Sequence, residues 1–345
     1  MWHLEKPTQE ILDNYVKKLL PNLKKRIEND PNLRQVVKDV LLPLKADGSR
    51  EVNILKSLLI NEPADLFVLS ESLMGQMITD YNFSELQDYS KAQKAFHKTP
   101  VQLALLSKYN LLSKLVVTFN YDVQLGNNKT RSYAMVAAAN HNTCVYCNRQ
   151  YTFNIVRNGG KNDDNRIARP ALDHWFPKSL FPLMSLSYYN LIPSCTICNS
   201  AVKSDEIWSL STHIHPYLTP PNVPVFKFRY KKGINNSWEI DFENLSGQEE
   251  NTVKSLCLKE AYQAHSGLEI ADLIELASKN NGSYMKQLYG EILKLYTGGG
   301  DKPKAYRLLL GTEMLPATFK NRPLSKMKKD IIEQIEKAQG MKFFE

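Results

Sequence analysis

Residues 171–203 read ALDHWFPKSLFPLMSLSYYNLIPSCTICNSAVK, and the fold that we predict depends on this segment. It contains one C-x-x-C knuckle, Cys195 and Cys198, and an earlier knuckle is formed by Cys144 and Cys147. In a chain without an export signal, two such knuckles indicate a metal site rather than disulfides. Four thiolates complete the tetrahedral shell that zinc prefers, so the sequence predicts a structural zinc site.

Residues between and beside the knuckles carry side chains that a purely structural zinc site does not need. Asp173 and His174 are neighbours, and in an extended segment they point to opposite faces and can serve different roles. His174 is a candidate general base, because neutral imidazole is available near pH 7. Asp173 and Asn199 offer oxygen ligands that suit Mg²⁺. Together these residue types suit hydrolysis of a phosphodiester bond, which needs a base, a metal ion and a group that keeps the base in place. We expect Asn190 to fix the orientation of the His174 ring and Lys203 to bind a phosphate group through its positive charge.

The order of these motifs, Cys-x-x-Cys, Asp-His, Asn, Cys-x-x-Cys-Asn and Lys, resembles the zinc-ribbon branch of the HNH endonucleases. The resemblance covers about a fifth of the chain and implies a ββα-metal unit. It places a hairpin from about Ile167 to Leu191 and a helix starting near Cys195. The insert 158–169 departs from the usual pattern, since it lengthens the gap between the knuckles to 47 residues. Compact two-knuckle sites have gaps of ~15–20 residues, so assembly of the zinc site depends here on the fold.

The resemblance also implies the roles of the site residues. It implies Asp173 and Asn199 as ligands of a catalytic Mg²⁺ or Mn²⁺, His174 as the general base and Asn190 as the residue that fixes the loop. The implied activity is metal-dependent hydrolysis of DNA phosphodiester bonds.

A second resemblance involves residues outside the zinc-ribbon motif. His215-Pro216-Tyr217, and Arg322-Pro323-Leu324-Ser325-Lys326 with Lys328 and Lys329, resemble the flanks of HNH nucleases from bacterial anti-phage systems. The nearest are the Septu nuclease subunit and the retron-associated HNH effectors. This resemblance implies an effector of anti-phage defence that works beside an ATPase subunit.

The composition narrows the class of protein. The chain has 345 residues, of which 43% are hydrophobic and 23% charged, so it can bury a core. No run approaches the ~18 apolar residues of a membrane span, and residues 1–7 do not resemble a secretory signal. We therefore expect a cytoplasmic protein. Lys and Arg number 44 against 36 for Asp and Glu, and the net charge of +8 suits a polyanionic partner such as DNA. We expect no small-molecule substrate.

Hydrophobic periodicity predicts an α+β protein that is mostly helical and has three parts. Residues 1–135 form a helical N-terminal region, 136–223 the zinc-ribbon HNH domain, and 224–345 a short β-hairpin followed by helices. The predicted elements are helices over 11–20, 33–41, 52–59, 103–117 and 133–139, a helix opened by a capping box at Ser84–Gln87, and strands over 225–230 and 238–242.

Other interpretations of the same residues stay open. A non-catalytic zinc ribbon that binds nucleic acid or a partner protein also explains the cysteines and the charge, and the nuclease chemistry could act on RNA. His213 and His215 are as well explained by packing as by metal binding. One basic run is either a solvated helix face or a DNA-backbone contact; it consists of Lys320, Arg322, Lys326, Lys328 and Lys329.

Overall fold

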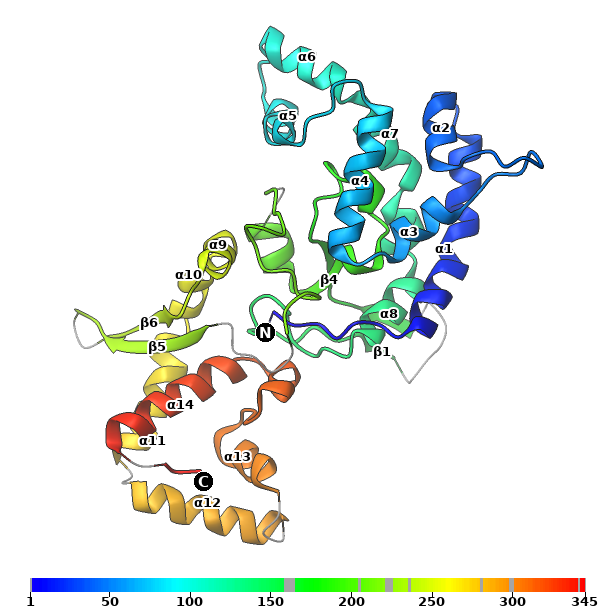
Figure 1. Ribbon diagram of the computed structural model, residues 1–345. Helices are drawn as coiled ribbons and strands as arrows, with labels where there is room; N and C mark the ends of the chain where they lie inside the picture. The colour runs from blue at the N-terminus through cyan, green and yellow to red at the C-terminus, as the bar shows by residue number, and fades with distance from the viewer. Residues whose placement is uncertain are drawn as a thin grey trace.

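The computed structural model of the protein describes residues 2–157, 165–203, 206–220, 226–234, 237–279, 282–297, 301–340 and 342–344 (Figure 1). These residues are mostly helical and include three two-stranded antiparallel sheets. The predicted class, α+β and mostly helical, is therefore confirmed. The N-terminal helices and the C-terminal elements occupy opposite ends of the molecule, and the segment around β4 (Leu191–Ser194) lies between them (Figure 1).

The N-terminal region is helical because its apolar residues recur at helical spacing. The longest helix buries one stripe of side chains, from Leu12 to Ile27. The elements are α1 (Gln9–Asn29), α2 (Gln35–Leu41), α3 (Asn53–Ile60), α4 (Pro63–Met77), α5 (Leu86–Lys94), α6 (Pro100–Lys108), α7 (Asn110–Phe119) and α8 (Lys129–Ala138), with a π-helix, η2 (Asp122–Gly126), between α7 and α8.

Two local predictions in this region are corrected. The helix expected over 103–117 is divided into α6 and α7, because the chain turns at Tyr109 to bury the ring and bring its hydroxyl 2.8 Å from Glu85. The capping box expected at Ser84 is absent. The side chain of Asn82 instead accepts from the backbone N–H of Ser84 and caps the short 3-10 helix η1 (Phe83–Glu85).

The central region contains a hairpin over residues 171–194, a few residues later along the chain than the expected 167–191. Strand β3 (Ala171–His174) pairs with β4, with Asp173 opposite Ile192 and His174 opposite Leu191. A short π-helix, η6 (Ile197–Val202), follows β4 directly and lies against β3. The insert contributes strand β2 (Arg166–Ala168), which pairs with β1 (Ile155–Val156) just before the insert, and residues 158–164 lie outside the described residues.

The C-terminal region begins with the second predicted hairpin, β5 (Lys227–Lys232) and β6 (Trp238–Glu243), and continues in helices. The last helix covers the edge of β5. The amide of Gln334 both accepts from the backbone N–H of Tyr230, at 3.0 Å, and donates to its carbonyl, at 2.9 Å. The helices are α9 (Gly247–Ser255), α10 (Leu258–Gln263), α11 (Ala271–Lys279), α12 (Gly282–Thr297), α13 (Lys302–Leu310) and α14 (Ser325–Gln339).

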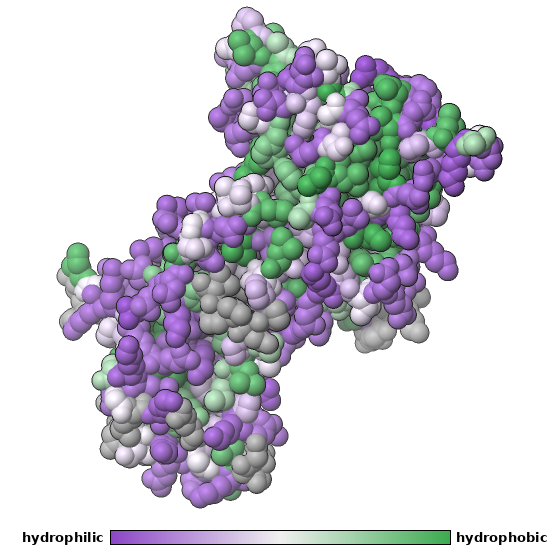
Figure 2. Space-filling model, viewed as in Figure 1, coloured by the Kyte–Doolittle hydropathy of each residue, from purple (hydrophilic) through white to green (hydrophobic). Residues whose placement is uncertain are grey.

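The N-terminal helices support the loop that joins β3 to β4. Phe67 of α4 stacks on Phe176 of the loop at 5.6 Å between ring centroids, and the Tyr15 hydroxyl of α1 donates to the Leu186 carbonyl at 2.8 Å. Through these contacts the core around the β3–β4 hairpin is continuous with the N-terminal helices. On the face shown in Figure 2, hydrophobic residues gather at the N-terminal end, whereas hydrophilic residues dominate the C-terminal end.

Candidate metal centre and active site

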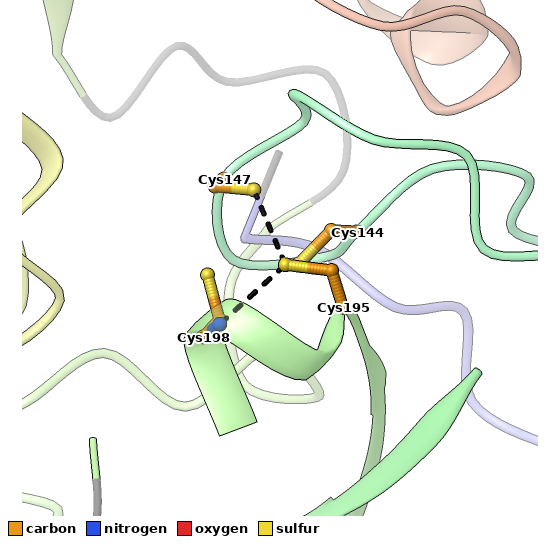
Figure 3. A group of neighbouring side chains, drawn as sticks. All are labelled: Cys144, Cys147, Cys195 and Cys198. Carbon is orange, nitrogen blue, oxygen red and sulfur yellow. Dashed lines mark hydrogen bonds between the residues drawn. The ribbon is translucent and has the colours of Figure 1, made fainter. Parts of the chain in front are cut away.

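The four paired cysteines meet at one point (Figure 3). Cys144 and Cys147 come from the loop after α8, Cys195 from the end of β4 and Cys198 from η6, and all four are buried. Their sulfur atoms lie within 4.8 Å of one another, and Cys147 Sγ is 3.9 Å from Cys195 Sγ. Tetrahedral Zn–S bonds of 2.3 Å place sulfur atoms ~3.8 Å apart, so the cluster fits a metal ion such as zinc.

Segments from both ends of the chain hold the first knuckle in place. The buried indole of Trp2 donates to the Tyr146 carbonyl at 2.7 Å, and the Trp2 backbone N–H donates to the Val145 carbonyl at 2.9 Å. From the C-terminal side, the Tyr262 hydroxyl donates to the Cys147 carbonyl. These contacts hold the first knuckle where it meets the second, 47 residues further along the chain.

Asp173 and Lys203 form a buried ion pair beside the metal centre. Lys203 Nζ lies 3.0 Å from Asp173 Oδ2, and the Tyr146 hydroxyl donates to the same oxygen at 2.6 Å. Lys203 is only 1% exposed, donates to the His174 carbonyl at 2.5 Å and lies over the Trp208 ring. This corrects the prediction for Lys203, because a buried amino group already bound to a carboxylate cannot meet a phosphate of the substrate.

The imidazole of His174 is held in a defined orientation. Its Nε2 lies 2.9 Å from the Ser185 carbonyl, which can only accept, so Nε2 carries the proton and Nδ1 has the lone pair. In the part of the chain that the structure describes, no side chain hydrogen-bonds to Nδ1. Burial lowers the pKa of His174 to about 3, against the raising effect of the hydrogen bond to Ser185, so the ring is neutral at pH 7.

Asn190 stabilises the loop that supplies the Ser185 carbonyl. The fully buried amide of Asn190 donates to the carbonyls of Phe176 and Met184, each at 3.0 Å. Its Oδ1 accepts from the Phe176 N–H at 2.7 Å. Asn190 therefore acts on His174 indirectly: it closes the loop, and the loop carbonyl holds the ring. This modifies the prediction that Asn190 itself fixes the imidazole.

Asn199 lies on η6, next to β3, and is partly exposed. Its Nδ2 donates to the Ser200 hydroxyl at 3.0 Å. Asp173 and Asn199 thus lie on neighbouring elements. Lys203 and Tyr146 bind the Asp173 carboxylate through Oδ2. In both Asp173 and Asn199, the oxygen that could face a metal ion is Oδ1.

A residue of the N-terminal region reaches the same site, although the sequence indicated no chemical constellation there. The ring of Tyr121, immediately before η2, packs edge-on against the His174 imidazole at 4.3 Å between centroids. Lys178 Nζ lies 4.9 Å from the centre of the Tyr121 ring. No local sequence signal marks Tyr121, because its contact with His174 spans 53 positions and is created by the tertiary fold.

The basic run near the C-terminus is neutralised within the protein. Each of its members lies within 2.6–3.3 Å of a carboxylate, in the pairs Lys320–Glu5, Arg322–Glu313, Lys326–Asp330, Lys328–Glu269 and Lys329–Glu333. These pairs give no support to the interpretation of the run as a DNA contact.

His213 and His215 belong to the aromatic core around Lys203. His213 stacks on Trp208 at 4.8 Å between centroids, and His215 packs against Trp175 at 4.7 Å. Among the described residues, the metal-ligand cluster is made of the four cysteines and includes neither histidine.

No family model, curated protein or solved structure matches the chain. None of the helices in the described ranges combines the length and the apolar character needed to cross a membrane. The function must therefore be inferred from the site itself.

Proposed function

We propose that the protein is a metal-dependent endonuclease of the ββα-metal type that hydrolyses phosphodiester bonds in DNA. The observation that carries the proposal is the arrangement of His174: it ends the first strand of a hairpin, its Nε2 is bound to the Ser185 carbonyl, and its Nδ1 is left as an acceptor. A helical segment with Asn199 follows the hairpin directly, which is the order of elements that such a site requires.

In this proposal the residues of the chain divide the work of hydrolysis. His174 Nδ1 takes a proton from the attacking water, and the Ser185 carbonyl keeps the imidazole in the required tautomer. Asn190 keeps the loop closed so that this carbonyl stays in place. The partial exposure of His174 and Asn199 gives water access to the site.

Asp173 and Asn199 would hold Mg²⁺ or Mn²⁺ through their Oδ1 atoms, since carboxylate and amide oxygens are suitable ligands for these ions. When bound, such an ion polarises the phosphate and stabilises the charge on the leaving oxygen. Lys203 and Tyr146 orient the Asp173 carboxylate through its other oxygen.

The resemblance to nucleases of anti-phage systems extends the proposal to the biological role. On this basis the protein is an effector of anti-phage defence that acts on DNA in the cytoplasm beside an ATPase subunit.

Plasmid cleavage tests the proposal. Purified wild-type protein should nick or linearise supercoiled plasmid with Mg²⁺ or Mn²⁺ and not with EDTA, and His174→Ala should lose this activity. His97→Ala is the matched control, because His97 is exposed and lies outside the site. Cleavage that persists in His174→Ala would contradict the assigned mechanism.

A second function is favoured by one observation, the neutralisation of Asp173 by Lys203. If this pair is purely structural, the central region is a zinc-stapled module that binds nucleic acid or a partner without cleaving it. That function predicts that the protein binds DNA or a partner protein but does not cleave DNA with any metal ion, even when proteins that co-purify with it are present. Parallel assays with structured RNA would show whether the same hydrolysis acts on RNA instead of DNA.

A further inference from the structure

The π-helix η2 collects three cationic side chains from different parts of the chain. Lys178 pairs with Asp122 of η2, with Nζ 3.2 Å from both carboxylate oxygens. Arg131 Nη1 donates to the Gln124 carbonyl at 2.8 Å, and Arg169 Nη2 donates to the Gly126 carbonyl at 2.8 Å. We refer to Arg131, Arg169 and Lys178 as the η2 cation cluster. Short π-helices occur frequently at functional sites.

The charge of this cluster is largely unneutralised. No carboxylate forms an ion pair with Arg131 or Arg169 among the residues that the structure describes, and Lys178 shares the single, mostly exposed Asp122. Three cations and one carboxylate leave a net charge of +2. Each guanidinium has five N–H donors. Arg131 Nη1 donates to the backbone and side-chain carbonyls of Gln124, and Arg169 donates to the Pro170 and Gly126 carbonyls and interacts with the Tyr121 hydroxyl, so both arginines keep donors for an anion.

A single side chain, that of Tyr121, separates the η2 cation cluster from His174. Tyr121, immediately before η2, lies between them, with its ring 4.3 Å from the imidazole and 4.9 Å from Lys178 Nζ. Arg169 also interacts with the Tyr121 hydroxyl and partly offsets the rise in its pKa, to about 12, that burial causes. The same few residues therefore position His174 and the three cations relative to one another.

We propose that the η2 cation cluster binds the phosphate backbone of duplex DNA next to the phosphate that is cleaved. This inference rests on the proposed nuclease function and assigns the contact for which Lys203 is too deeply buried. Half-buried arginines anchored on carbonyls lose little conformational freedom on binding, and arginine pairs with phosphate in a two-point geometry. Arg131 and Arg169 supply the phosphate contacts, and Lys178 adds charge nearest to His174.

The salt dependence of DNA binding tests this inference. Anisotropy of a labelled DNA duplex is measured between about 50 and 200 mM salt in the His174→Ala background, which prevents cleavage. Each phosphate contact contributes ~0.9 to the slope of log affinity against log salt, so Arg131→Gln with Arg169→Gln should lower the slope by about 2. Glutamine keeps an N–H donor for the η2 carbonyls, and the charge-retaining pair Arg131→Lys with Arg169→Lys should keep most of the slope.

The matched control removes the same charge elsewhere, with Lys328→Gln and Lys329→Gln in the neutralised basic run. Its slope should equal that of the parent. Equal slopes for the two glutamine pairs would overturn the inference, and the nuclease proposal would stand if the wild type cleaves plasmid. A wild type that does not cleave, combined with a slope that falls by about 2, would overturn the nuclease proposal and retain the cluster as a DNA-binding surface.

Discussion

The C-terminal basic run and the η2 cation cluster use positive charge in opposite ways. In the run, Lys326 is almost completely buried against Asp330, Lys329 pairs with Glu333 of the same helix, and Lys328 pairs with Glu269 of another segment. At η2, Arg131 and Arg169 bind backbone carbonyls instead, which hold the guanidinium groups without neutralising them. The comparison teaches that an anion-binding surface is located by the partners that each basic side chain has in the fold, and not by the density of basic residues in the sequence.

The largest expected effect is that of the metal on the central region. Structural zinc contributes ~10–16 kcal/mol of binding free energy in zinc-finger peptides, far more than any single contact. We expect Cys195→Ser to lose the metal and to increase hydrogen exchange in β4 and η6, while α12–α14 keep their protection. Cys257→Ser is the control, since Cys257 is exposed and outside the cluster. Wild-type protein without bound metal, or unchanged exchange in Cys195→Ser, would contradict the assignment of the metal centre.

The next effect distinguishes a structural lysine from one that binds substrate. Lys203→Ala leaves the Asp173 carboxylate buried without its partner, which should cost about 3–5 kcal/mol of unfolding free energy. Lys254→Ala removes an exposed, paired lysine and should cost less than about 1 kcal/mol. Denaturant unfolding measures both. A cost for Lys203→Ala as small as that of the control would mean that the lysine is accessible to a phosphate after all.

Two hydrogen-bonded amides, the buried Asn190 and the half-buried Gln334, allow effects on stability to be distinguished from effects on catalysis. Asn190 bridges the loop before β4, and Gln334 bridges α14 to β5, and each bonds both a backbone N–H and a carbonyl. Replacing either by alanine should cost about 1–3 kcal/mol, because backbone groups lose their partners. Only Asn190→Ala should also lower kcat with KM unchanged, since only that loop holds His174. If Asn190→Ala and Gln334→Ala lost cleavage activity equally, Asn190 would contribute only to stability and not to catalysis.

The smallest effect concerns an ion pair of the basic run. The hydrogen bond and charge of Lys320 lower the pKa of Glu5 below its ordinary value of 4.5. A lowered pKa means that the pair stabilises the protein above pH 4.5 and that this contribution is lost as the pH falls through the folded-state pKa. Glu5→Gln should therefore be less stable than the wild type by under about 1 kcal/mol at neutral pH, and the two should converge in acid. A difference that persists or grows in acid would contradict the pairing.

The chemistry of the metal centre was predictable from sequence because both knuckles are local patterns. The hairpin that carries Asp173 and His174 was expected only from the resemblance to the HNH endonucleases, and its expected bounds, 167–191, differ by a few residues from the observed 171–194. The helix α4 was not predicted, because apolar residues occur on several of its faces and Val68 is exposed.

The burial of Lys203 could not be predicted, because it depends on Asp173, 30 positions earlier, whose carboxylate is itself held by Tyr146 of the first knuckle. Tyr121 and Arg131 escaped notice for a related reason. The contact of Tyr121 with His174 spans 53 positions, and neither Tyr121 nor Arg131 belongs to a recognisable sequence pattern. Local chemistry was therefore predictable, whereas the neutralisation of individual charges required the tertiary structure.

The central claim, that His174 is the general base of a nuclease, is tested most directly by the single-turnover rate of plasmid cleavage with Mg²⁺. The rate is compared between wild type and His174→Ala at equal bound metal. A positioned base contributes ~10²–10⁴-fold to such a reaction, so the account predicts a fall of at least about 100-fold in His174→Ala. Equal rates for the two proteins would contradict it.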